Sequence, residues 1–488
     1  MENQDKKPNI IAIIGAIVLL VLAVVGLSYA FFSAFIKNGE TDPSIEGTGA
    51  NLSLVYTDGK SVITSSNIMP GWSATKTFTV TNNGEADTYY KLNISNITNE
   101  FVDGGLTFSI ASADGGTSVA EQAVGTTTRT ISPSITIAEG ATHMYTVTAK
   151  YINLNTDQTP DLGKSFSYTI GIEASQKPTF KDIILANNEV KTPITTPGAA
   201  VSTSSEALLA SAEDDYGTSY YFRGAVTNNY VEFANKCWRI VRIGGDNTVK
   251  LILHNDNISN ASNPCSSANN STTAAFVHYD GNIYKSEFNS NYNDNAYVGF
   301  MYGTPGSTTY EATHANTNKS TILTNLETWY NNNLKTYESV IDNNVFCNDK
   351  SLSSGSGYSA NATDYAARER LYTSKIPSLK CNGELSKITS KIGLITADEL
   401  AFAGYAVRGY ITTSYLKENA TGYSWWSLSP AGFYNKSLSY VFRVRSDNDA
   451  IDICNVNVDS SVRPVISLVS SITISGVSGT SEDPYVVK

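Results

Sequence analysis

An uninterrupted apolar stretch near the start limits where the rest of this chain can reside. Residues 10–36 carry no charge and read IIAIIGAIVLLVLAVVGLSYAFFSAFI. As a helix rising about 1.5 Å per residue, they would extend about 40 Å, enough to cross a bilayer with some tilt. Lys6 and Lys7 precede the stretch, and only Lys37 follows it closely. The positive-inside rule therefore predicts a transmembrane helix, a cytoplasmic tail at 1–9 and an extracellular remainder.

A cleaved signal peptide is the alternative interpretation of the same stretch. Ser28-Tyr29-Ala30 forms a small-x-small site, and cleavage there would leave Phe31 as the new terminus. The apolar run is longer than the about 7 to 15 residues of a signal core, which favours the anchor. Both interpretations export the chain, either as a single-pass membrane protein or as a secreted one.

The charge balance narrows the partners of the exported part. The chain has 34 Lys and Arg against 45 Asp and Glu, a net charge of −11. Such a chain is repelled by phosphate backbones, so nucleic acid is not an expected partner. Its 488 residues allow roughly three domains at about 150 residues each.

Five cysteines, all beyond residue 236, favour disulfides in an exported chain. Cys237 and Cys265 flank a predicted hairpin and the loop that follows it. Cys347 and Cys381 flank a polar loop, and we expect each of these two pairs to form a bond. Cys454 would remain as a buried free thiol. The alternative is five reduced thiols that act as small core residues.

Period-2 stretches separated by Gly, Pro and Asn turns fill residues 47–175, among them NLSLVYT, ATKTFTVT and TYYKLNI. Short strands at regular spacing predict an immunoglobulin-like β-sandwich. The segment SYAFFSA, followed by NIMPGWSATKTFTVTNNG, resembles the camelysin and TasA class of Gram-positive surface and matrix-fibre proteins. The resemblance implies a surface protein that can assemble through its strand edges. Residues 176–213, rich in Pro, Gly, Ser and Thr, are predicted to be a linker with a short helix at 205–212.

The remaining residues, 214–488, predict a larger α+β domain of mixed short strands and a few helices. A Gly-Gly-Asp-Asn turn at 244–247 indicates a hairpin. Apolar residues at three- and four-residue spacings predict a helix over 320–335. Thr396 and Glu399 form a capping box that begins another helix.

Sequence blocks in this region occur in a recognisable order. They are YYFRGAVTNNYVEFANKCWRIVRI, FMYGTPGSTTYEATHANTNKS, CNDKS, KIGLITADELAFAG, WWSLSP, VRPVISL and GTSEDPYVV. The set resembles a widespread exported domain family of unknown function from Firmicutes. The placing of WWSLSP before VRPVISL also resembles C-type-lectin-like and formylglycine-generating folds, at the level of the fold alone.

Catalytic signatures are absent from the sequence. It contains no metalloprotease, nucleophile-elbow, P-loop or dinucleotide-binding motif. The four His, at 143, 254, 278 and 314, are far apart, so a structural or surface role is expected for each. We therefore expect that the chain is not an enzyme and binds no cofactor. One candidate Ca²⁺ site is the exception. Asp447, Asp449 and Asp452 cluster on a turn where Ca²⁺ could bind, although the central Gly and closing Glu of an EF-hand loop are missing.

The most promising recognition residues are Trp425, Trp426 and Tyr434. Adjacent residues of a strand face opposite ways, so at most one of the two indoles should lie in a core. An exposed aromatic ring near the acidic turn, with Asp447, Asp449 and Asp452, could stack on a sugar. The alternative is that both indoles pack under neighbouring loops. Arg463 is expected to be buried, with its guanidinium bonded to loop carbonyls or a carboxylate.

These observations favour a non-enzymatic bacterial surface protein. In this interpretation the sandwich is a membrane-anchored stalk for a C-terminal domain that binds an extracellular glycan or protein. The runner-up is a structural or matrix-forming protein that assembles through the sandwich. An unrecognised extracellular enzyme is the third alternative.

Overall fold

The computed structural model describes residues 29–30, 54–59, 63–64, 68–84, 86–175, 178–408, 413–472, 474–475 and 478–487. The described part of the chain is mainly β, as the sequence predicts, with 40% of these residues in strands and 14% in helices. Two compact units divide it, Met1–Pro178 and Thr179–Lys488.

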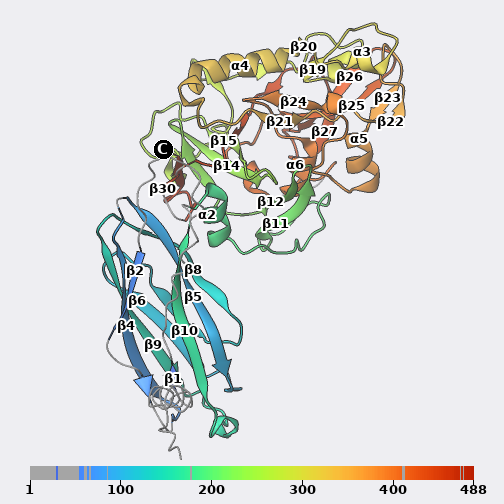
Figure 1. Cartoon of the computed structure of the whole chain (residues 1–488). Coiled ribbons are helices and arrows are strands. Elements are labelled where there is room, and N and C mark those ends of the chain that lie inside the picture. The colour runs from blue at the N-terminus through green and yellow to red at the C-terminus, as the bar shows by residue number, and fades with distance from the viewer. Residues whose placement is uncertain are drawn as a thin grey trace, which may run out of the picture. The chain divides into compact units, whose positions relative to one another are not determined.

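The N-terminal unit consists mainly of two antiparallel sheets of long strands (Figure 1). One has five strands in the order β2-β4-β9-β6-β7, and the other has three in the order β10-β5-β8. The five strands are β2 Leu54–Asp58, β4 Trp72–Asn82, β9 Thr142–Tyr151, β6 Leu106–Ser112 and β7 Val119–Ala123. The three are β10 Phe166–Ser175, β5 Thr88–Asn99 and β8 Arg129–Ile137. Side chains from both sheets meet in one core, which is the arrangement of a β-sandwich.

Alternation along β4 shows why this sequence forms a sandwich strand. Phe78 and Val80 are buried, while the alternate residues Thr77 and Thr79 reach the other face. Gly71, just before the strand, has a φ of +94°, a backbone conformation that other residues rarely adopt. The predicted Pro-Gly turn and strand are therefore confirmed at this position.

The predicted transmembrane helix at 10–36 lies outside the described residues, except for Tyr29 and Ala30. These two form strand β1 (Tyr29–Ala30), which pairs with β3 (Ile63–Thr64). Across the described part of the chain, no helix combines the length and the apolar character needed to span a bilayer.

The C-terminal unit contains an eight-stranded and a seven-stranded sheet. The first holds β11 Ala207–Asp214, β12 Gly217–Gly224, β13 Tyr230–Phe233, β14 Lys236–Ile243, β15 Val249–Asn255, β29 Val465–Leu468, β30 Ile474–Ser475 and β31 Tyr485–Val487. The second holds β18 Lys285–Ser286, β22 Leu352–Gly355, β23 Thr363–Tyr365, β25 Trp425–Tyr434, β26 Leu438–Val444, β27 Ile451–Asn455 and β28 Ser460–Ser461. Most of the buried apolar residues of this unit form one core cluster.

Three two-stranded antiparallel sheets complete the described strands of this unit. They are β16 His278–Tyr279 with β17 Asn282–Ile283, β19 Met301–Tyr302 with β20 Asn318–Lys319, and β21 Asn344–Cys347 with β24 Lys387–Ser390. The hairpin predicted around the Gly-Gly-Asp-Asn turn is confirmed, because β14 pairs antiparallel with β15.

Helices of this unit agree with the sequence in two places. The helix predicted over 320–335 is α4 (Thr321–Asn333), whose N-cap Ser320 accepts a hydrogen bond from the Leu323 amide. The predicted capping box begins α6 (Ala397–Phe402), where both reciprocal hydrogen bonds are formed. The shorter helices are α3 Tyr310–Thr313 and α5 Ala366–Arg368.

The predicted linker at 176–213 has a different structure. Residues from Thr179 onward belong to the C-terminal unit and include α2 (Phe180–Asn187), with Phe180 in the core. The helix predicted at 205–212 is instead strand β11, which pairs with β12 from Ala207 to Asp214. Cross-strand pairing has overridden the helical preference of its Ala, Leu and Glu residues.

Candidate functional site

The tandem tryptophans are buried, and the prediction that one of them is exposed is wrong. Trp425 and Trp426 both have 0% of their surface accessible. The indole N–H of Trp426 donates to the Ser286 carbonyl at 2.7 Å. The guanidinium of Arg463 lies 5.0 Å from the centre of the Trp425 ring. Side chains alternate along β25 as expected, but this strand lies inside a sheet whose two faces are both covered.

Arg463 is buried as expected, and loop and strand carbonyls accept from it. Its Nε donates to Leu253 O at 2.8 Å, and Nη1 donates to Leu416 O at 2.7 Å. Tyr434 ends β25 half-buried, with its hydroxyl donating to Asp364 at 2.6 Å. Neither residue lies in a shared binding surface with the tryptophans.

Ion pairs and hydrogen bonds hold the acidic turn. Arg445 pairs with both Asp447 and Asp452, and Asp449 pairs with Lys417 at 2.9 Å. Asp452 accepts from the Tyr372 hydroxyl at 2.8 Å. Within the described residues, no group of three or more His, Cys, Asp and Glu could hold a metal ion. These carboxylates therefore stabilise local loops and do not converge on a common point.

Both predicted disulfides are present in the structure. Cys237 bonds to Cys265, and Cys347 bonds to Cys381. Cys454 is free and buried, as expected. Burial raises the pKa of this thiol, which disfavours the reactive thiolate.

A charged cavity lies beside the second disulfide, between α6 and the first sheet. At its centre is the buried Glu399, whose Oε1 is 2.7 Å from Lys250 Nζ and 2.9 Å from Arg242 Nε. Arg242 also contacts Asp214 at 2.8 Å. Burial by itself would raise the pKa of Glu399, but the charges of Lys250 and Arg242 outweigh it and lower the pKa to about 2.

A second ion cluster completes the wall of this cavity. Arg370 forms two parallel bonds of 2.9 Å to Asp398 and a third contact of 2.7 Å to Asp349. The free space left between these groups is about 40 Å³, the volume of only a few water molecules. Arg242, Lys250 and Arg370 are thus each paired with carboxylates of the charged cavity.

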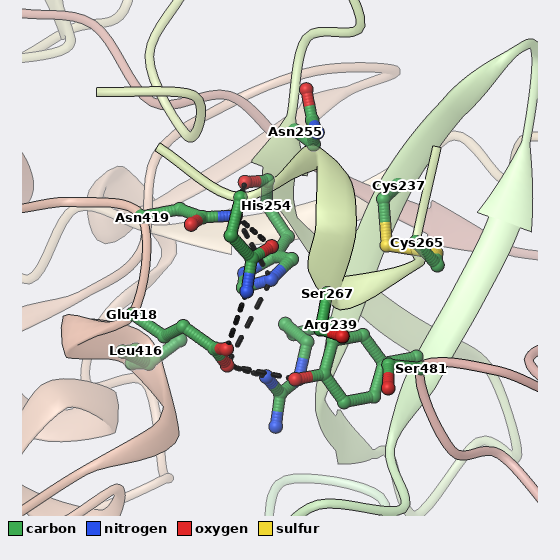
Figure 2. A network of polar contacts seen from close by, with 12 residues as sticks. Cys237, Arg239, His254, Asn255, Cys265, Ser267, Leu416, Glu418, Asn419 and Ser481 are labelled. Carbon is green, nitrogen blue, oxygen red and sulfur yellow. Dashed lines mark hydrogen bonds and ion pairs between the residues drawn. A yellow bond between two sulfur atoms is a disulfide. The ribbon is translucent and has the colours of Figure 1, made fainter. Parts of the chain in front are cut away.

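A third polar cluster, the Glu418 network, reaches the surface (Figure 2). The Glu418 carboxylate is 39% exposed and accepts from the Tyr230 hydroxyl at 2.7 Å and from Arg239 Nη1 at 2.9 Å. Its other oxygen accepts from the Asn270 amide at 2.8 Å. Arg239 is fully buried and lies 3.7 Å from the centre of the Tyr230 ring. These contacts attach the loop at Glu418 to strands β13 and β14.

His254 lies behind Glu418 in Figure 2 and is fully buried. The Asn419 amide is 3.2 Å from its Nε2, and Glu418 is 3.9 Å away. Burial first, and then the charges of Arg239 and Arg463, hold the pKa of His254 well below its usual value. The neutral His254 imidazole, with Nε2 as acceptor, therefore supports the loop at Glu418. The Glu418 carboxylate already accepts hydrogen bonds from three donors.

An open polar pocket lies at the end of β15. Fewer of its side chains form ion pairs than in the charged cavity. The volume of the polar pocket is about 220 Å³. Its walls are formed by Asn255, Asp256, Asn257, Ile258, Ser259, Asn269, Ser271, Thr273, Ala274 and His278. From the sequence, the stretch between residues 255 and 273 is predicted only to be a loop. The signal that could have identified it is the density of Asn, Ser and Thr between residues 255 and 273.

Partly exposed tyrosines occur on the hairpin β16–β17, which contains His278 of this polar pocket, and on the segment before β25. Tyr279 is 38% exposed and packs edge-on against Tyr284, with ring centres 4.9 Å apart. Tyr423 is 36% exposed, with Lys285 Nζ 5.2 Å from its ring centre. The exposed aromatic surface sought at the tryptophans is thus found at these tyrosines.

Comparison with known proteins adds little to this geometry. No family model matches the chain, and no curated protein matches it. A solved structure with local similarity is a family 123 glycoside hydrolase from Clostridium perfringens, studied for glycolipid glycan hydrolysis. The two are 14% identical over 25% of this chain and 24% of that one, with a TM-score of 0.12. Similarity this slight carries no argument about fold or activity.

Proposed function

We propose that this chain is a non-catalytic bacterial cell-surface protein whose C-terminal unit recognises an extracellular ligand. The N-terminal helix anchors it in the membrane with the terminus in the cytoplasm, and the β-sandwich acts as the stalk. The ligand is a glycan or a protein, and adhesion is the biological result. The two units are an immunoglobulin-like sandwich and a C-type-lectin-like α+β domain in this proposal.

The observation that supports recognition best is the contrast between the two cavities. The charged cavity is lined by four basic residues, of which Arg242, Lys250 and Arg370 are paired with its own carboxylates, and it has about 40 Å³ of free space. Acid–base catalysis needs a group within hydrogen-bond reach of a bound substrate. The polar pocket, with about 220 Å³, is open, and most of its hydrogen-bonding groups are neutral Asn, Ser and Thr side chains. Such a surface suits binding more than bond cleavage.

An array of glycans and host proteins, probed with the purified full chain, tests this proposal. We expect saturable binding to a restricted chemical class. The heat-unfolded chain is the control, because a folded recognition surface should be lost on unfolding. Absence of binding to every spot, together with turnover of a glycoside or peptide substrate, would replace recognition by catalysis.

Assembly through the sandwich is the second candidate, and it has an observation of its own. Strand β10 lies at the edge of its three-stranded sheet and pairs, among the described strands, along its length only with β5. Its sequence FSYTIGIEAS contains no Pro and no Lys, two residues that often protect edges from pairing with another chain. The opposite edge strand, β8, contains Pro133.

Sedimentation and electron microscopy of the full chain separate the two candidates. If β10 mediates assembly, polymers form at micromolar concentration, and Ser167→Lys in β10 reduces them. Ser132→Lys is unsuitable as a control because Ser132 is buried, so Thr136→Lys on β8 is the matched variant. A chain that stays monomeric eliminates assembly and leaves recognition as the function.

A further inference from the structure

The polar pocket contains a buried side chain, His278, of which one polar atom makes no hydrogen bond. The His278 side chain is only 4% exposed, and its Nδ1 makes no hydrogen bond. The closest charged atom is Asp256 Oδ2 at 3.7 Å, beyond hydrogen-bonding distance. A buried polar atom without a partner costs free energy, and a ligand or water that orders the site can recover it.

Hydrogen bonds hold Asp256, the carboxylate of the polar pocket, in place, and Lys236 neutralises its charge. Asp256 Oδ1 accepts from Lys236 Nζ at 2.8 Å, and Oδ2 accepts from the His278 amide at 2.9 Å. A carboxylate has about four lone-pair sites, so each oxygen can accept one more hydrogen bond. Because Lys236 neutralises the charge, neither a cation nor an anion is favoured over a neutral ligand.

Hydroxyl groups line the rest of the polar pocket. Ser259 and Ser271 are exposed and Thr273 is half-buried, and these hydroxyls make no hydrogen bond to the described part of the chain. The amides of Asn255 and Asn257 are bonded to backbone carbonyls, which makes the floor rigid. The polar pocket thus has hydroxyl groups that are available for hydrogen bonding, above a rigid floor.

An apolar face lies next to these polar groups. Tyr279 follows His278 in β16, and the edge of Tyr284 supports its exposed ring. Partial burial, then Tyr284 and then the charge of Asp256 raise the pKa of the Tyr279 hydroxyl. Tyr279 adjoins the pocket through its neighbour in the chain, His278, which belongs to the pocket wall. An aromatic ring beside neutral acceptors and donors matches the two faces of a sugar, one of C–H groups and one of hydroxyls.

We propose that the polar pocket binds the terminal neutral sugar of a glycan, an inference that rests on the recognition function proposed above. Its volume of about 220 Å³ is below the about 300 Å³ at which pockets for drug-sized ligands begin, which suits one ring. Asp256 and His278 bond the sugar hydroxyls, Ser271 and Thr273 complete the hydrogen bonds, and Tyr279 stacks on the ring.

Ligand-observed NMR on the full chain, with a panel of neutral mono- and disaccharides, tests this assignment. We expect saturation transfer to at least one sugar, and about tenfold weaker binding in Tyr279→Ala and in Thr273→Val. Tyr292→Ala is the matched control, because Tyr292 is 40% exposed and Tyr279 is 38% exposed. The control should bind as the parent does, and unchanged melting temperatures would show that all variants fold.

The outcomes distinguish this inference from the function on which it rests. Sugar binding that survives both pocket substitutions would place the glycan elsewhere on a chain that still recognises one. Binding to host proteins with no sugar bound would overturn the glycan assignment and keep recognition. Absence of binding to any sugar or protein would overturn both the glycan assignment and the recognition function.

Discussion

At the scale of single residues, local sequence rules predicted burial better than exposure. The rule that neighbours in a strand face opposite ways holds for Trp425 and Trp426, yet both are buried because their sheet is covered on both faces. Single-strand periodicity says which side chains share a face. It does not say whether another layer covers that face, because this depends on segments far away in the sequence.

Removing either indole should therefore destabilise the C-terminal unit. We expect Trp425→Ala and Trp426→Ala each to lower the free energy of unfolding by about 3 to 5 kcal/mol, as for other large core truncations. Val458→Ala, at a side chain that is 39% exposed, should change it by less than about 0.5 kcal/mol. Urea unfolding measures all three. A Trp variant as mild as the Val458 variant would show that its indole is not core.

Glu399 predicts how this unit responds to acid. Its folded-state pKa of about 2 lies below the unfolded value near 4.5, so the ion cluster stabilises the fold above pH 4.5. This contribution, about 3 kcal/mol, is lost as the pH falls from about 5 to 2. Glu399→Gln should flatten that loss in unfolding titrations at successive pH values. Glu384→Gln, at a side chain that is 88% exposed, is the control and should keep the parent's dependence.

At the scale of elements, signals contained within one segment were reliable. The apolar stripe of α4, the capping box of α6 and the hairpin β14–β15 could all be predicted, because each depends on neighbouring residues. Strand β11 was predicted as a helix, because its pairing with β12 determines its conformation. The polar pocket was missed for the same reason. It is formed where the loop after β15 returns to His278, and no periodic pattern marks such a return.

The two disulfides close loops that contain strands of the two large sheets, β14 and β15 in one loop and β22 and β23 in the other. They close sequence separations of 28 and 34 residues, and each contributes about 3 to 4 kcal/mol in the chain-entropy model. Replacing Cys237 and Cys265 together by Ala should lower the free energy of unfolding by that amount, measured in guanidinium. Cys454→Ala controls for loss of a buried thiol alone. Peptide mapping without reductant should recover both linked pairs, and labelling of all five thiols would contradict it.

At the scale of the whole molecule, each unit has its own apolar core. We expect two unfolding transitions, and residues 47–175 expressed alone should unfold at the same denaturant concentration as in the full chain. Trp72 is the one tryptophan of the sandwich. In a Trp72→Phe variant, tryptophan fluorescence therefore reports only the unfolding of the C-terminal unit. A single transition shared by both units would show that they fold cooperatively.

Strand β31 sets a condition on how the C-terminal unit folds. It pairs in parallel with β13, and the Tyr485 ring is buried against Phe180 at the start of the same unit. The sheet that begins with β11 is therefore completed by a strand far along the chain. Until β31 is in place, an edge of β13 and part of the core are open to water and to proteases. A chain cut between β13 and β31 would leave the unit unfinished, so protection from proteolysis requires that both ends of the unit have met.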